Sequence, residues 1–138
     1  MIKKLHHVSI AVKNLDEALK LYEQLFDLKA SKVEVVPEQG VKAALIPIGD
    51  GAEIEFIEPI DPNGGVAKFL ENKGEGIHHI CLEVDNIDQA LNTISERGCQ
   101  LIDKKSRNGL AGKIGFVHPK STKGVLIELA QTDEGKSH

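Results

Sequence analysis

Apolar and polar residues alternate along two short stretches of the chain, residues 6–12 and residues 78–84. An alternation with a period of two predicts half-buried β-strands. After each stretch, apolar side chains recur at helical spacing, which predicts an amphipathic helix. Asn14 and Asn86 precede these helices as N-caps, each with Glu or Gln three positions later, as in a capping box. The pattern therefore predicts a strand followed by a helix, twice.

The two strand–helix segments are copies of each other. Leu5–Leu19 reads LHHVSIAVKNLDEAL and Ile77–Leu91 reads IHHICLEVDNIDQAL, with identical residues at seven of the fifteen aligned positions. The copies continue to AEIEFIEP in the first half and to VLIELAQ in the second. An internal repeat of this length shapes the whole fold, so it has to be recognised before single elements are assigned.

Each copy continues into three further strands, so each half of the chain is a βαβββ module. The modules span residues 1–60 and residues 76–131, and Val66–Asn72 is expected to form a short helical linker between them. The further strands are expected at Lys32–Val36, Val41–Ile48, Glu53–Glu58, Cys99–Ile102, Lys113–Val117 and Val125–Ala130. One module cannot cover both faces of its sheet, so the two must pack together. The sequence therefore predicts one α+β domain over residues 1–138.

The period-two pattern separates the four histidines. His6 shares a face with apolar residues that the first helix should cover, whereas His7 lies on a face of small residues with Ser9. In the second copy the same geometry separates His79 from His78. We therefore interpret His6 and His78 as packing residues and His7 and His79 as functional candidates.

Two glutamates near the ends of the modules match these histidines. Glu55 and Glu128 face away from the apolar side of their strands, at an offset of 73 residues against 72 for the histidines. A solitary glutamate of this kind would be an ordinary solvent-facing residue, but two at equivalent repeat positions indicate a shared site. Pseudo-twofold symmetry would bring both His–Glu pairs to one point. Such a mixed N/O set suits a divalent transition metal, and four protein ligands leave open positions for catalysis.

Composition excludes several other functions. The formal net charge of −4 argues against nucleic-acid binding, which depends on Lys and Arg contacts to phosphates. No stretch approaches the length of a membrane span, and the N-terminus lacks the long apolar run of a secretory signal. Cys81 and Cys99 provide no disulfide framework. We therefore expect a cytoplasmic protein that binds neither nucleic acid nor a membrane.

Three segments give the sequence a family resemblance. They read PEQGV (Pro37–Val41), VAKFLENKGEGIHHICLEVDNID (Val66–Asp88) and HPKSTKGVLIELAQ (His118–Gln131). With the paired modules, they resemble the vicinal oxygen chelate superfamily, which includes glyoxalase I, and within it the methylmalonyl-CoA epimerase subfamily along nearly the whole chain. The resemblance implies a vicinal oxygen chelate fold, in which the two modules form a cupped mixed sheet around a metal site.

The resemblance also implies an activity and a cofactor. The activity is the interconversion of (2R)- and (2S)-methylmalonyl-CoA through abstraction of the proton alpha to the thioester and a metal-stabilised enolate. Two adjacent open metal positions would match a chelating 1,3-dicarbonyl. One divalent ion per chain is expected, Co²⁺ first and Mn²⁺, Ni²⁺ or Zn²⁺ as alternatives, with a CoA thioester as partner and a homodimer as assembly. The implied metal ligands are His7, Glu55, His79 and Glu128.

Inversion of a stereocentre requires proton carriers on both faces of a planar intermediate. The resemblance assigns one of these roles to Glu128. Several bacterial relatives have a glutamate shortly after the EQG stretch, where this chain has Ala43. Glu38, Glu53 or a metal-bound water are candidate substitutes, and we favour Glu38 as the second catalytic residue.

The substrate itself suggests three further contacts. Gln39 lies in the EQG segment and could touch the substrate carboxylate. His118 could line the mouth of the pocket, and Lys120 could offer a counter-charge to coenzyme A phosphates. Each of these residues could equally be an ordinary surface residue.

Other members of the superfamily suggest three alternative functions. A glyoxalase I-like lactoylglutathione lyase uses the same metal frame and similar enolate chemistry. An extradiol dioxygenase requires two His and one carboxylate on iron, which the additional Glu55 argues against. A ligand-sequestering protein needs no metal, so the retention of all four metal positions argues against that function.

Overall fold

The computed structural model describes residues 1–132, and the chain divides into two compact units. The first, here called the His7 unit, spans His7–His78. The second, here called the His79 unit, contains Met1–His6 together with the chain from His79 onward. Each boundary therefore falls inside one of the two histidine pairs.

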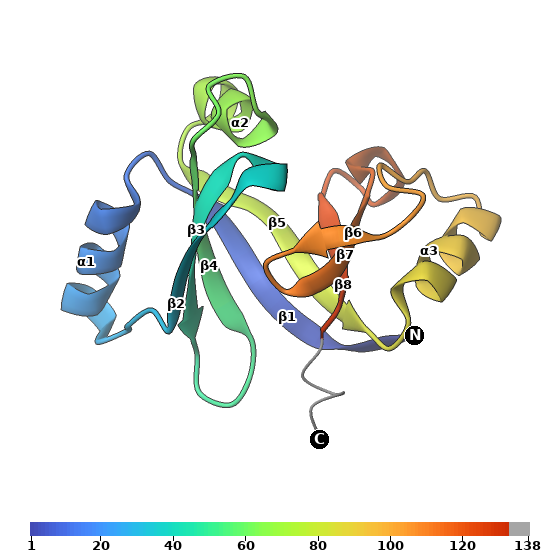
Figure 1. Ribbon diagram of the computed structural model, residues 1–138, viewed down its shortest axis with the longest axis horizontal. Helices are drawn as coiled ribbons and strands as arrows, with labels where there is room; N and C mark the ends of the chain where they lie inside the picture. Colours follow the sequence, from blue (N-terminus) through green and yellow to red (C-terminus); the bar gives the residue numbers. More distant parts are fainter. Residues whose placement is uncertain (133–138) are drawn as a thin grey trace. The chain divides into compact units, whose positions relative to one another are not determined.

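The His7 unit contains a mixed sheet, to which strand β1 (Ile2–Ala11) contributes from His7 onward (Figure 1). Its other elements are α1 (Leu15–Phe26), β2 (Lys32–Val36), the 3₁₀ turn η1 (Pro37–Gln39), β3 (Val41–Pro47), β4 (Glu53–Pro59) and α2 (Gly65–Lys73). The strands pair in the order β1-β4-β3-β2. The β1–β4 pair is parallel, and the other two pairs are antiparallel.

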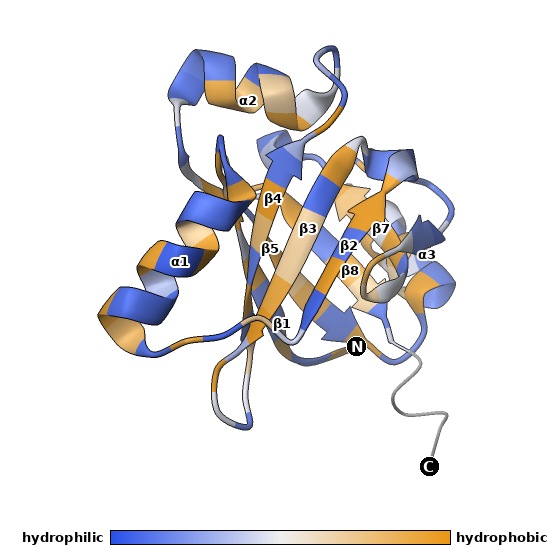
Figure 2. Cartoon of the chain, turned by 60° about the vertical axis from the view of Figure 1, so that its left-hand side comes forward, coloured by the Kyte–Doolittle hydropathy of each residue, from blue (hydrophilic) through white to orange (hydrophobic). Residues whose placement is uncertain are grey.

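Helix α1 covers the apolar face of this sheet. Its N-cap is Asn14, whose side-chain oxygen accepts a hydrogen bond of 2.9 Å from the Glu17 amide. In Figure 2 the helix carries both hydrophobic and hydrophilic residues, as expected for a helix with one buried side. The core under it consists of Val12, Leu15, Ala44, Ile46 and Phe56. The sheet face that carries His7 is therefore the one that α1 leaves uncovered.

The His79 unit repeats this arrangement with β5 (Gly76–Val84), of which the residues from His79 belong to it. Its other elements are α3 (Ile87–Glu96), β6 (Arg107–Gly109), β7 (Gly112–Val117), the 3₁₀ turn η2 (Pro119–Ser121) and β8 (Ile127–Gln131). The strands pair in the order β5-β8-β7-β6 (Figure 1). The β5–β8 pair is parallel, like the β1–β4 pair of the first unit, and the other two pairs are antiparallel.

Helix α3 lies very close to its sheet. Asn86 caps it by accepting a hydrogen bond of 3.0 Å from the Gln89 amide. Leu91 is fully buried in the core, and a Cβ built on Gly115 would lie 2.9 Å from its Cδ1. Gly98, at φ +86°, follows Arg97, the C-cap residue of the helix. A glycine on β7 thus allows the close approach of α3.

The predicted elements agree with the structure except at two places in the second half of the chain. The expected strand Cys99–Ile102 is wrong, because only Leu101 forms a bridge, with Val117. The short strand β6 (Arg107–Gly109) takes the outer position instead, and no hydrophobic alternation indicates it. Strand β8 begins at Ile127, two residues later than expected, because Val125 and Leu126 are irregular and follow a turn over residues 122–124.

The α+β class is confirmed, since each unit combines helices with a mixed sheet. A helix at the expected linker position is also confirmed as α2, which lies inside the His7 unit; the division into modules 1–60 and 76–131 stays a prediction. Within residues 1–132, no helix combines the length and the hydropathy that a membrane crossing requires.

Candidate metal centre

In the His7 unit, His7 on β1 and Glu55 on β4 meet on the uncovered face of the sheet. The parallel register places Ser9 directly opposite Glu55. His7 lies two residues before Ser9 and therefore on the same face of the sheet. His7 Nε2 is 3.4 Å from Glu55 Oε1. The Ser9 hydroxyl donates a short hydrogen bond to the same carboxylate oxygen. All three side chains are buried, with 1%, 6% and 0% of their surface exposed for His7, Glu55 and Ser9.

The His79 unit contains the same arrangement with different neighbours. Cys81 is directly opposite Glu128, and His79 Nε2 lies 3.1 Å from Glu128 Oε1. Both side chains are at least 95% buried. The ring of Phe116 packs edge-on against the His79 imidazole, with 5.3 Å between ring centroids. The equivalence that the sequence repeat predicted therefore holds at the level of strand register.

The two pairs differ at one position. Ser9 and Cys81 occupy equivalent places on β1 and β5, each two residues after its histidine and opposite its glutamate. A hydroxyl is a strong hydrogen-bond donor, whereas a thiol is a weak one. The sequence alignment shows this difference, but only the register places each residue opposite a carboxylate.

The chemistry of these side chains fits a divalent metal ion. Imidazole nitrogens and carboxylate oxygens are ligands that first-row transition metals accept. Each unit holds one buried pair of such donors, His7 with Glu55 in the first and His79 with Glu128 in the second. A buried carboxylate is costly unless it is paired, and each glutamate here has its own histidine. The residues are thus consistent with a divalent metal site, and the donors do not identify the metal.

The other histidine of each pair has a different environment. The His78 ring packs against Phe69 with a centroid distance of 4.9 Å, within the His7 unit. His6 is buried, with 7% of its surface exposed. The ring contact of His78 agrees with its interpretation as a packing residue.

The remaining predicted site residues lie in two 3₁₀ turns. Glu38 and Gln39 belong to η1, where Glu38 is exposed and Gln39 half-buried. His118 is the N-cap of η2, since its Nδ1 accepts a hydrogen bond of 3.0 Å from the Lys120 amide. Lys120 itself is exposed. The roles of these four residues stay predictions.

One acidic residue, Glu34, lies opposite Ala43, where relatives were expected to have a glutamate. Ala43 is buried on β3 and lies directly opposite Glu34 of the edge strand β2. Glu53 lies directly opposite His7, on the same face of β4 as Glu55. Sequence reasoning named Glu53 but missed Glu34, because only the register of β2 against β3 places it opposite Ala43.

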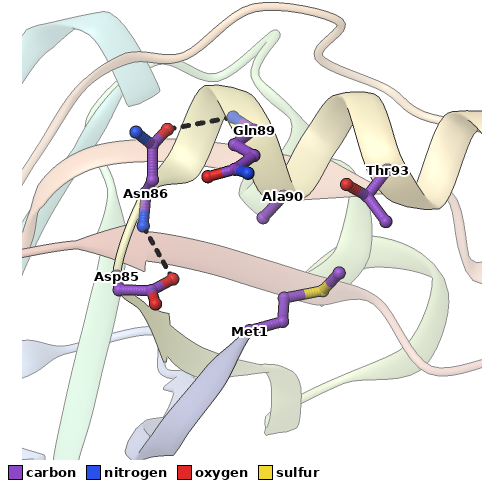
Figure 3. Close-up of a pocket in the computed structure, with 6 residues that line it drawn as sticks. All are labelled: Met1, Asp85, Asn86, Gln89, Ala90 and Thr93. Carbon is purple, nitrogen blue, oxygen red and sulfur yellow. Dashed lines mark hydrogen bonds between the residues drawn. The ribbon is translucent and has the colours of Figure 1, made fainter.

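A pocket of about 170 Å³ lies beside the N-terminus of α3, away from the predicted site residues (Figure 3). Its polar groups already serve the helix, because Asn86 accepts from Gln89 and its amide donates to Asp85. The lining residues are Met1, Asp85, Asn86, Gln89, Ala90 and Thr93. Helix capping therefore accounts for the Asn86 side chain in this pocket.

Comparisons with known proteins agree on one family. The family model described as "Glyoxalase/Bleomycin resistance protein/Dioxygenase superfamily" matches residues 6–118. The mitochondrial methylmalonyl-CoA epimerase of Dictyostelium discoideum is 39% identical over 132 residues, which cover 94% of this chain and 79% of that protein. The lactoylglutathione lyase of Schizosaccharomyces pombe is 30% identical over 150 residues, which cover 96% of this chain but 49% of that protein.

The solved structures give the same result. Streptomyces coelicolor methylmalonyl-CoA epimerase, in complex with 2-nitronate-propionyl-CoA, matches with a TM-score of 0.94 at 30% identity. The match covers 97% of each chain. The similarity thus extends over nearly the whole chain in both sequence and structure.

Proposed function

Because the chain belongs to the glyoxalase/bleomycin resistance protein/dioxygenase (vicinal oxygen chelate) superfamily, we propose that it is a metal-dependent epimerase of methylmalonyl-CoA. It is similar to methylmalonyl-CoA epimerases over nearly its whole length. The observation that carries the proposal is the buried His–Glu contact that recurs at equivalent positions on β1–β4 and β5–β8. The substrate class, a CoA thioester, is supported by the ligand of the S. coelicolor structure.

The proposed ligands of one divalent ion per chain are His7, Glu55, His79 and Glu128. A bound divalent cation acts as a Lewis acid that favours the enolate of a thioester. Within each unit, the strand register already holds an imidazole next to a carboxylate. Burial excludes water from these groups and strengthens their electrostatic interactions. Co²⁺ is the proposed ion, and Mn²⁺, Ni²⁺ and Zn²⁺ are the alternatives.

Glu128 is the proposed proton carrier on one face of the substrate. It is buried beside His79, and the Phe116 ring borders the His79 imidazole. Glu38 is the proposed carrier on the other face, where it stands on the exposed turn η1. A side chain on a surface turn can adjust its rotamer when substrate arrives, which a proton carrier on an open face requires.

Proton exchange in D₂O separates the two carriers. An enzyme with one carrier left should exchange the alpha proton of one epimer without converting it into the other. We therefore expect Glu38→Gln to abolish epimerisation and to leave exchange in one epimer. Glu34→Gln serves as the control, and Glu53→Gln tests the alternative carrier. Full epimerisation by Glu38→Gln would exclude Glu38 as a proton carrier.

Substrate binding and assembly complete the proposal. Gln39 is proposed to contact the substrate carboxylate, and Lys120 the phosphates of coenzyme A. His118 uses Nδ1 to cap η2, so its Nε2 is the atom that would face the substrate. The proposed assembly is a homodimer, which light scattering at working concentration would test.

The main test compares two neighbouring histidines of β5. His79→Ala should abolish divalent metal binding and the inversion of (2R)- and (2S)-methylmalonyl-CoA. The matched control is His78→Ala, one residue away and in contact with Phe69, which should retain both. Wild-type protein that shows no inversion above background after loading with Co²⁺ or Mn²⁺ would contradict the proposed function.

Lactoylglutathione formation is the second candidate function. The similarity to the S. pombe lyase favours it, although this chain covers half of that protein. Turnover of the glutathione hemithioacetal of methylglyoxal, without activity on CoA esters, would support lactoylglutathione lyase activity and contradict epimerase activity.

A further inference from the structure

A row of side chains crosses the His79 unit on the face that carries His79. Phe116 on β7 lies directly opposite Glu128 on β8, and Arg107 on β6 lies directly opposite Ile114, two residues before Phe116. Residues opposite each other in an antiparallel pair share one face of the sheet. Arg107, Phe116 and Glu128 are therefore on the same face, in order from the edge strand inward.

Asp103 binds the backbone of Phe116 at the position where a neighbouring strand would otherwise pair with it. The pairing of β6 with β7 covers Gly112 to Ile114, so Phe116 lies beyond it. The Phe116 amide donates a hydrogen bond of 2.8 Å to Asp103 Oδ2. In return, the Phe116 carbonyl accepts hydrogen bonds from the amides of Ile102 and Asp103, at 2.9 and 3.2 Å. Both backbone groups of Phe116 on this edge are thus held by the segment that contains Asp103.

The same carboxylate also holds Arg107 over the Phe116 ring. Arg107 Nε donates a hydrogen bond of 3.1 Å to Asp103 Oδ1, the oxygen that Phe116 does not use. The Arg107 Cζ atom lies 5.5 Å from the centroid of the Phe116 ring. This distance is within the range of a favourable cation–π interaction. Asp103 therefore links the backbone of Phe116 to the cation that packs on its side chain.

We propose that Asp103 and Arg107 are positioning residues that fix the Phe116 ring and, through it, the orientation of the His79 imidazole. The inference rests on the proposed function in so far as His79 is a metal ligand. A histidine ring can rotate about its Cβ–Cγ bond, and the edge-on contact with Phe116 restricts that rotation. Ligand orientation by neighbouring groups typically affects metal affinity about 10–100-fold.

The chain offers a matched control for Arg107. Its only other arginine is Arg97, which is exposed at the end of α3. The variants to compare are Arg107→Ala, Asp103→Asn, Phe116→Leu and Arg97→Ala. Arg107→Lys is the conservative variant, because a lysine ammonium can also lie over the ring and pair with Asp103. Amide spectra of each variant establish that it is folded.

The first measurement uses metal-free protein at one fixed pH. Ring ¹H–¹⁵N correlations of His79 report the environment and mobility of its imidazole. We expect changed or broadened His79 signals in Phe116→Leu, Arg107→Ala and Asp103→Asn, wild-type signals in Arg97→Ala and partial recovery in Arg107→Lys. Combining Arg107→Ala with Phe116→Leu should add little to Phe116→Leu alone, since Arg107 acts through the ring. His79 signals unchanged in all three variants would overturn the proposal.

The second measurement follows Co²⁺ binding by visible absorption. Affinity should fall about 10–100-fold in Phe116→Leu and about tenfold in Arg107→Ala, with kcat reduced and KM for the thioester nearly unchanged. Equal Co²⁺ affinity and equal spectra across these variants would also overturn the proposal. If the wild-type protein binds no divalent ion, the proposed function fails, while the His79 ring signals still decide the positioning role.

Discussion

The hydrogen bond from Ser9 to Glu55 leads to a quantitative prediction about stability. Ser9→Ala removes one hydroxyl donor from a buried carboxylate and changes little else, because alanine fits wherever serine does. Ser9 is fully buried and Glu55 is 6% exposed, so water cannot replace the lost donor. A hydrogen bond to a charged group contributes about 1.5–3 kcal/mol to the free energy of unfolding. At about 4 °C per kcal/mol for a domain of this size, Tm should fall by about 6–12 °C.

The chain contains the same chemical pair in an exposed position. Ser106 Oγ donates a hydrogen bond of 3.2 Å to Asp88 Oδ2 at the surface. Because water can solvate Asp88 after the change, Ser106→Ala should reduce the free energy of unfolding by less than about 0.5 kcal/mol. The difference between the two variants therefore isolates the contribution of burial.

Urea and thermal unfolding in EDTA are the appropriate measurements, since chelation removes any contribution of bound metal to stability. Both variants should retain the wild-type m-value, which reports the surface exposed on unfolding. Equal stability of Ser9→Ala and Ser106→Ala would refute the argument that Glu55 depends on Ser9 in the folded protein.

Three further predictions concern the His79 unit. Gly115→Ala places a Cβ 2.9 Å from the buried Leu91 and should lower the free energy of unfolding by about 1–3 kcal/mol, measured in urea; an unchanged midpoint would contradict the close approach of α3. Asn86→Ala removes the α3 cap and should cost about 1 kcal/mol, whereas Asn86→Asp should retain most of the stability. Lys3→Ala removes the 3.4 Å ion pair with buried Glu83 and should cost about 1 kcal/mol, an effect that 1 M salt should leave largely intact if burial limits screening.

The sequence predicted the elements that depend on local patterns. The N-caps at Asn14 and Asn86 are confirmed, because capping needs only a side chain three residues from its partner amide. Strand β2 has the predicted bounds Lys32–Val36. The predicted strand Cys99–Ile102 failed because its backbone amides bind unrelated partners instead of forming a ladder: the Cys99 amide donates to the Ile94 carbonyl, the Gln100 amide to the Ser121 hydroxyl and the Ile102 amide to the Phe116 carbonyl. Strand β6 was missed, since its sequence RNG is short and has no apolar alternation.

The residues of the candidate site were likewise predictable only where a local pattern or the repeat places them. Period-two geometry alone placed His7 and His79 on the buried polar faces, and the repeat matched each to its glutamate. The contact between Asp103 and Phe116 could not be predicted, because it joins a loop to a strand thirteen residues later without any repeating spacing. The roles of Glu38 and Gln39 stay predictions.

Ser9 and Cys81 also bear on how a duplicated gene diverges. Two identical copies of the module would place the same side chain opposite both glutamates. With oxygen opposite one carboxylate and sulfur opposite the other, the two acids no longer share one environment. The surroundings of either glutamate can therefore change by substitution of the residue opposite it, without changing the surroundings of the other. Exchanging the two side chains, with Ser9→Cys and Cys81→Ser in one protein, would measure how far each glutamate depends on the residue opposite it.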